Sequence, residues 1–140
     1  MKQVVSVFTF FLFFCSISYS QNNILCDSTN VYEIVEIMPL FPGGDAAFAE
    51  YLRNEIKYPS IESDCSFTSS IYLSFVVDTS GETTCAEILR PEPGNCILQN
   101  GFGDSLISLI YSMPRWTPGM QNHRKVRVRM VIPLRIDIEE

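Results

Sequence analysis

Four cysteines beyond an apolar N-terminal run are the residues of this chain that are best suited to chemistry. They are Cys26, Cys65, Cys85 and Cys96. An even number of cysteines in an exported chain is typical of disulfides, and two bonds can be arranged in three ways. The sequence has no CxxC pair, and its single histidine, His123, has no cysteine near it. We therefore expect disulfides and no zinc site.

The strand pattern in the middle of the chain suggests which cysteines pair. If Asp78 lies opposite Thr83 across a tight turn, the same register brings two cysteines together at the open end of the hairpin. The remaining two would then tie the N-terminal segment to the sheet. The predicted pairs are Cys65–Cys96 and Cys26–Cys85. Each bond would contribute roughly 2–4 kcal/mol to stability.

No set of catalytic residues stands out. The sequence contains no GxSxG, no glycine-rich phosphate loop and no HExxH. A nucleophilic cysteine with His123 as its base remains formally open, but the use of the cysteines in disulfides argues against it. We expect neither an enzyme nor a bound metal or cofactor.

An alternating stretch near the C-terminus, residues 125–138, is the most regular pattern in the chain. Seven apolar side chains face one way, and the opposite side carries Lys125, Arg127, Arg129 and Arg135. The period of two predicts a long strand with one buried face. Pro133 has no amide hydrogen, and prolines inside sheets occur on edge strands. We therefore expect this strand at the edge of the sheet.

The cationic row on this strand has two interpretations. It could only protect the edge, by repelling the same strand of another copy. Alternatively, the exposed backbone could accept an extended peptide as an added strand, with a preference for peptides that carry acidic residues. Titratable residues elsewhere in the chain are scattered, so this strand is the main candidate for a binding site.

The other elements must position this strand. Residues 31–38 and the pair 71–78 and 83–90 have strand patterns, and the pair is expected to form a hairpin. Residues 45–58 and 103–113 carry apolar stripes at helical spacing. We predict an α+β two-layer sandwich, in which two helices cover one face of a small, mostly antiparallel three-stranded sheet. The one Trp, Trp116, would fill the seam between helix and sheet.

Length, charge and the N-terminus restrict the class of protein. The chain has 140 residues, with 10 basic and 16 acidic side chains, so we expect one domain and no binding to nucleic acid. Lys2 and an apolar run of about 14 residues predict a signal peptide over 1–20, shorter than the roughly 20 residues of a membrane-spanning helix. Residues 21–30 would form a flexible segment. A retained membrane anchor is the alternative.

Several motifs carry a family resemblance over residues 34–138. The stretches VEIMPLFPGGDAAFAEYLRNEIKYP, YLSFVVDTSGETTCAEILR, SMPRWTPGMQNHRKVRVRM and IPLRI resemble the C-terminal domain of TonB in its Bacteroidetes-type form. The resemblance implies a TonB C-terminal-like domain over 31–140, located in the periplasm. It also implies a structural role for a set of motif residues, Tyr58, Pro59, Pro114, Trp116 and Pro118.

Such domains bind the TonB box, a short peptide of TonB-dependent outer-membrane transporters, by adding it beside the last strand. Carried onto this chain, the peptide-binding residues would be Arg127, Val128, Arg129, Met130, Val131, Ile132 and Leu134. An ExbB/ExbD-type motor would be a further partner if the chain is anchored. The proline-rich spacer of a full transducer is missing between 20 and 31. A periplasmic binding module is therefore favoured, with a self-associating structural domain (a possible homodimer) or a full energy transducer as alternatives.

Overall fold

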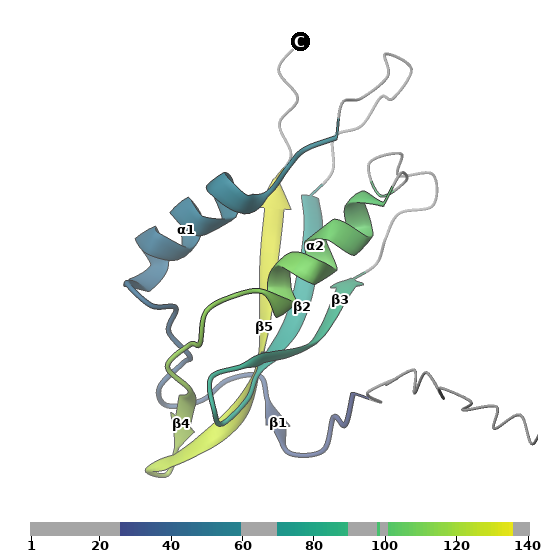
Figure 1. Ribbon diagram of the computed structural model, residues 1–140. Helices are drawn as coiled ribbons and strands as arrows, with labels where there is room; N and C mark the ends of the chain where they lie inside the picture. Colours follow the sequence, from purple (N-terminus) through teal and green to yellow (C-terminus); the bar gives the residue numbers. More distant parts are fainter. Residues whose placement is uncertain (1–25, 60–69, 90–97, 99–100, 136–140) are drawn as a thin grey trace, which may run out of the picture.

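The fold is seen in a computed structural model, which describes residues 26–59, 70–89, 98 and 101–135 (Figure 1). The predicted signal peptide at 1–20, most of the predicted flexible segment and the predicted Cys65–Cys96 bond lie outside the described residues. Within them, two helices and five strands form one α+β unit. The predicted fold class is confirmed at this level.

The sheet is larger than the sequence predicted. Four of its five strands lie in the order β1-β5-β2-β3, and the fifth strand, β4, also pairs with β5. The strands are β1 (Val31–Tyr32), β2 (Ser70–Val77), β3 (Thr83–Leu89), β4 (Gly119–Gln121) and β5 (Arg124–Arg135). Strand β1 is parallel to β5 and the other pairs are antiparallel. The prediction of a three-stranded sheet is therefore wrong: β4 is too short to give a periodic pattern, and part of the strand predicted at 31–38 joins the sheet as β1.

The predicted strand at 31–38 continues only as far as Tyr32. Beyond it the chain bends, and the side chains of Ile34 and Ile37 are 86% and 57% exposed. Backbone hydrogen bonds then join this segment to β4, at Ile37 with Met120. The apolar side chains that suggested a buried strand therefore lie largely on the surface.

Both helices cover the same face of the sheet. They are α1 (Gly44–Glu55) and α2 (Phe102–Tyr111), and each begins after a glycine with positive φ, Gly43 and Gly101. Alternate residues of β2 point to this face, and the helices pack on them in one core. The fully buried members of that core are Leu73, Phe75, Val77, Leu106 and Ile110.

Trp116 lies in this core beside three phenylalanine rings. Its side chain is 6% exposed, and its ring centroid lies 5.1 Å from Phe48, 5.4 Å from Phe41 and 5.6 Å from Phe75. Aromatic pairs at this separation stabilise a core beyond the area that they bury. Trp116 therefore joins α1, the loop before it and β2.

The β2–β3 hairpin contains a bulge at the second cysteine of the predicted pair. Tyr72 pairs with Leu89, as the predicted register requires. Between Ser74 and Val76 the register shifts by one residue, and the shifted pairing continues to the turn. Cys85 lies in this bulge with φ of 53°. It forms the predicted disulfide with Cys26, with 5.3 Å between the two Cα atoms.

The β4–β5 hairpin is the element that sets the orientation of the last strand. Asn122 and His123 form its two-residue loop, with φ of 49° and 60°. Positive φ at both loop residues is the backbone geometry of a type I′ turn. The turn places Gln121 opposite Arg124, and so determines which backbone groups of β5 point to each side.

Candidate functional site

The predicted binding strand has strand partners on both sides only around Val128. On one side it pairs with β4 at residues 124–126 and with β2 from Val128 to Arg135. On the other side β1 pairs with Arg127 and Val128. The prediction of an edge strand is therefore wrong at Arg127 and Val128, two of the predicted binding residues, because β1 covers them.

The outer side of β5 from Arg129 to Arg135, here called the open edge, has no strand partner among the described residues. In Figure 1 this is the upper half of the yellow strand, on the side away from β2. Seven residues of extended chain span about 23 Å. The sequence predicted peptide-binding residues from Arg127 to Leu134, and the structure leaves those from Arg129 onward without a strand partner on the outer side.

Strand alternation shows which backbone groups point outward at the open edge. Met120 exchanges both of its backbone hydrogen bonds with Ile37, so its neighbours in β4 direct theirs to β5. Arg124 and Val126, opposite those neighbours, therefore point toward β4. Continued along the strand with period two, that side also carries the N–H and C=O groups of Met130, Ile132 and Leu134. It is the side of β2, because Asp78 donates to Glu82 across the hairpin and its neighbour Val77 therefore turns to Val128 of β5. The open edge thus carries the backbone groups of Arg129, Val131, Pro133 and Arg135.

Pro133 belongs to this outward-pointing set. It lies opposite Tyr72, and by the same alternation its nitrogen points away from β2. The missing amide therefore costs no bond within the sheet and one possible donor at the open edge. The reason given above for an edge position, a proline nitrogen turned away from the partner strand, applies here. Arg129, Val131 and Arg135 keep their outward N–H donors, and all four residues keep their carbonyl acceptors.

The side chains along the open edge differ between the two faces of the sheet. On the face without helices, Val131 is 50% exposed, and Pro133 and Arg135 are also exposed. Arg129 donates to Glu87 of β3 over 3.2 Å, with side chains 31% and 53% exposed. On the helix face, Met130 and Ile132 pack against the core. An added strand would therefore meet cations on one face only.

The opposite border of the sheet, β3, is protected by three features. The bulge at Cys85 interrupts its regular backbone, and the disulfide attaches the N-terminal segment to it. The amide of Ala86 donates to the hydroxyl of Tyr111 over 3.3 Å. Bulges and side-chain bonds of this kind prevent unwanted strand pairing. At the open edge the described residues have neither a bulge nor a disulfide, and only Pro133 and the exposed cations limit which strand can pair there.

The five motif residues are dispersed around the fold. Trp116 is in the core, and Pro118 is half-buried just before β4. Pro114 is exposed and follows α2, whereas Pro59 is half-buried after α1. Tyr58 is 52% exposed, with its ring 6.2 Å from that of Phe102. None of them lies on the open edge.

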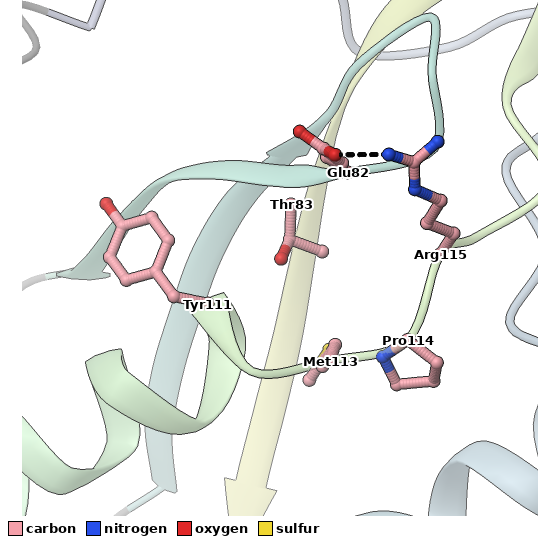
Figure 2. Close-up of a pocket in the computed structure, with 6 residues that line it drawn as sticks. All are labelled: Glu82, Thr83, Tyr111, Met113, Pro114 and Arg115. Atoms are coloured by element: carbon pink, nitrogen blue, oxygen red, sulfur yellow. Dashed lines mark hydrogen bonds and ion pairs between the residues drawn. The ribbon is translucent and has the colours of Figure 1, made fainter.

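A pocket of about 340 Å³ lies where β3 begins and α2 ends (Figure 2). Arg115 and Glu82 form an ion pair of 2.7 Å beside it, and their side chains are 70% and 54% exposed. Thr83 turns its hydroxyl away to donate to the Ile110 carbonyl over 2.6 Å. The pocket holds neither a cysteine nor a histidine. Sequence reasoning did not find it, because its lining comes from separate elements.

Neither metal binding nor membrane insertion is indicated by the described residues. They hold no group of three or more metal-ligating side chains. None of their helices is long and apolar enough to cross a membrane. Comparisons with protein-family models, with curated proteins and with solved structures found no match for this chain.

Proposed function

We propose that this protein is a peptide-binding module that takes up an extended peptide as an additional strand beside β5. The observation that carries the proposal is the row of outward-pointing backbone groups at Arg129, Val131, Pro133 and Arg135, where β5 has no strand partner among the described residues. A strand added there gains main-chain hydrogen bonds from a preformed edge, so little ordering of the protein opposes binding.

The chemistry of the open edge favours a short acidic peptide. Strand β1 covers β5 up to Val128, so the peptide has room for about six or seven residues. Its side chains on the helix-free face would lie beside Arg129, Val131, Pro133 and Arg135. A peptide in which apolar residues are flanked by acidic residues would match this order of side chains on β5. Because Arg129 already has Glu87 as a partner, Arg135 should contribute more to the charge preference.

In biological terms, the proposed partner is the TonB box of a TonB-dependent outer-membrane transporter, and the proposed location is the periplasm. The support for this partner is the sequence resemblance to the TonB C-terminal domain, together with an accessible final strand. We propose binding, not catalysis. Energy transduction with an ExbB/ExbD-type motor is the alternative, and it requires the apolar N-terminus to be a retained anchor.

A second copy of the chain is a poorer partner for the same edge. Two β5 strands that pair antiparallel over all four outward-pointing residues must place Ile132 opposite its own copy. Val131 then faces Pro133, which has no N–H to donate, and on the helix-free face Arg129 faces Arg135 of the partner copy. Like charges directly opposite each other destabilise a strand pair. This register argues that the protein is a monomer and that the open edge binds an acidic peptide.

Peptide titration followed by backbone amide NMR of the full chain would test the proposal. A labelled transporter peptide with acidic flanks should shift the amides of Arg129, Val131 and Arg135 more than those of β3. Strand addition uses only one edge of the peptide. N-methylation of alternate peptide amides should therefore weaken binding at one set of positions by about tenfold and leave the other set unchanged.

Two results would contradict the proposal. Shifts confined to the pocket around Arg115, or to the exposed segment near Ile34, would place the peptide elsewhere. Equal loss of affinity from both sets of N-methylated peptides would show that no strand is added. As a matched control, Arg53→Glu on α1 makes the same charge change as Arg135→Glu but lies away from the open edge. Only Arg135→Glu should weaken binding of the acidic peptide.

A further inference from the structure

The N-terminal segment of the described chain crosses the whole sheet. At one end, Cys26 is bonded to Cys85 on β3. At the other, Val31 and Tyr32 pair with the outer side of β5. Since β3 and the outer side of β5 lie at opposite borders of the order β1-β5-β2-β3, residues 26–32, here called the strap, pass over β2 and β5 between these attachments.

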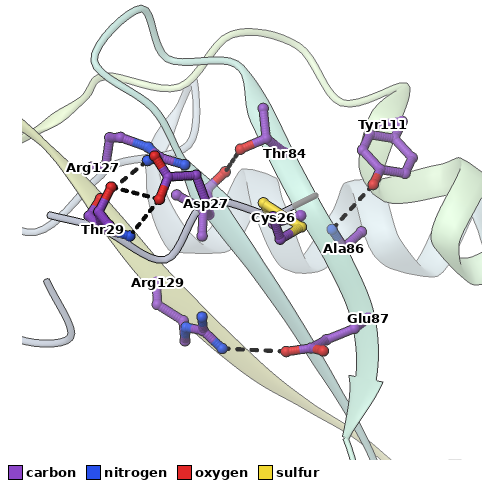
Figure 3. The surroundings of a disulfide bond; sticks show 11 residues. Cys26, Asp27, Thr29, Thr84, Ala86, Glu87, Tyr111, Arg127 and Arg129 are labelled. Carbon is purple, nitrogen blue, oxygen red and sulfur yellow. Dashed lines mark hydrogen bonds and ion pairs between the residues drawn. A yellow bond between two sulfur atoms is a disulfide. The ribbon is translucent and has the colours of Figure 1, made fainter. Parts of the chain in front are cut away.

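The strap crosses on the face without helices. The Arg127 side chain projects from β5 to that face, and it donates to the carbonyl oxygen of Thr29 over 3.3 Å. Figure 3 shows Cys26, Asp27 and Thr29 over the strands on the side of Arg127. On this face Ser74 and Val76 are only 1% and 2% exposed although no helix covers them. The strap therefore protects part of the second face from water.

Apart from the disulfide, few interactions hold the strap. Strand β1 has only two residues, and such a short strand is unstable on its own. The Asp27 carboxylate accepts from the Thr29 amide over 2.9 Å, which orders the strap internally without attaching it to the sheet. The attachment thus depends on the covalent bond at one end and on the paired segment at the other.

We propose that the Cys26–Cys85 disulfide is a redox latch that keeps the strap on β5. A dithiol reductant would transfer two electrons and two protons to the bond. It would leave two cysteine thiols and become a cyclic disulfide itself. With the latch open, the strap leaves Arg127 and Val128. By the alternation described above, Arg127 then adds its outward N–H and C=O groups to the open edge.

The released state differs from the latched one in two ways. The open edge lengthens toward β4 by two residues, Arg127 and Val128, and so accepts a longer peptide. At the same time, Ser74 and Val76 become accessible. The effect on peptide length rests on the proposed function, but the release of the strap does not. The two consequences can therefore be tested separately.

Hydrogen exchange of the full-length exported chain would test the release. We compare the oxidised protein, the protein reduced by a dithiol, and the variant Cys26→Ser/Cys85→Ser. The Arg127 amide should exchange about tenfold faster or more in the last two, while the Phe75 amide in the core keeps its protection. The variant Cys65→Ser/Cys96→Ser is the control for loss of other thiols, and it should retain slow exchange at Arg127 until the dithiol is added.

Unchanged exchange at Arg127 after reduction would overturn the latch, because the strap would then be held without the bond. Equal acceleration at Arg127 and Phe75 would also overturn it, by showing that the bond stabilises the entire fold. A peptide extended by two residues supplies the second measurement, and reduction should increase its affinity at least threefold over that of the shorter peptide. If the Arg127 amide becomes exposed but neither peptide binds, the latch stands and the proposed function fails.

Discussion

The backbone of Trp116 lies directly against Gly81 in the turn between β2 and β3. The Trp116 amide donates to the Gly81 carbonyl oxygen over 2.8 Å, and a Cβ atom placed on Gly81 would collide with the Trp116 carbonyl oxygen. Gly81 also has φ of 87°. The position of the buried indole therefore depends on the absence of a side chain at residue 81.

Replacement of Gly81 by alanine should destabilise the protein by about 2–4 kcal/mol, through the positive φ and the collision together. Urea unfolding would measure the loss as a lower midpoint at an unchanged slope. Gly44→Ala is the matched control, because Gly44 has φ of 86° but no atom within 4 Å of the added Cβ. Similar losses for both variants would show that the contact with Trp116 is unimportant.

Trp116 itself should tolerate phenylalanine much better than alanine. Its Nε1 atom is buried and has no hydrogen-bond partner among the described residues, so a phenylalanine loses ring volume but no polar contact. We expect about 3–5 kcal/mol of destabilisation for Trp116→Ala and about half of that for Trp116→Phe. Chemical denaturation of the two variants is the measurement. Equal losses would point to an unseen partner of the indole nitrogen.

The turn at Asp78 should make stability depend on acid. Partial burial acts to raise the pKa of Asp78, but hydrogen bonds from Ser80 and Glu82 lower it overall. Its carboxylate accepts from the Ser80 amide over 2.7 Å and from the Glu82 amide over 3.0 Å. A carboxyl whose pKa is lower in the folded state stabilises above its unfolded pKa of about 4 and loses this effect as the pH falls.

Asp78→Ala should therefore cost about 1 kcal/mol at pH 7, since the group is largely exposed. The difference from the native protein should shrink below about pH 4, as the native carboxyl is protonated. Unfolding free energies at pH 7 and pH 3 check the trend. The non-titrating variant Asp78→Asn should show less dependence on pH in this range. A difference that grows on acidification would contradict the argument.

The charges at the open edge predict how the chain associates with itself. The native protein should sediment as a monomer, because antiparallel pairing of two open edges places Arg129 opposite Arg135 of the partner copy. Arg135→Glu reverses one charge of each pair and should produce a concentration-dependent dimer. Sedimentation of both proteins over a range of concentrations tests this. A native dimer, or a monomeric variant at millimolar concentration, would contradict the assigned register.

The sequence was most informative where a pattern was long. The period of two in β5 and β2 and the apolar stripes of both helices predicted those elements to within a few residues, because each buries one face against the core. The Cys26–Cys85 bond was predicted as the pair that remained once the hairpin register had joined Cys65 to Cys96, although a bulge shifts part of that register. By contrast, β4 was missed, since three residues give no usable period, and the strand predicted at 31–38 is real only at Val31–Tyr32.

The candidate site shows the same division. The sequence alone determined that the last strand is long, amphipathic and cationic on one face, because side-chain type and period depend only on local order. Only the tertiary structure decided which half of that strand is open. The pairing of β1 and β4 depends on a type I′ turn at Asn122 and on a disulfide to β3. These contacts join residues that are far apart in the chain, and no local pattern encodes them.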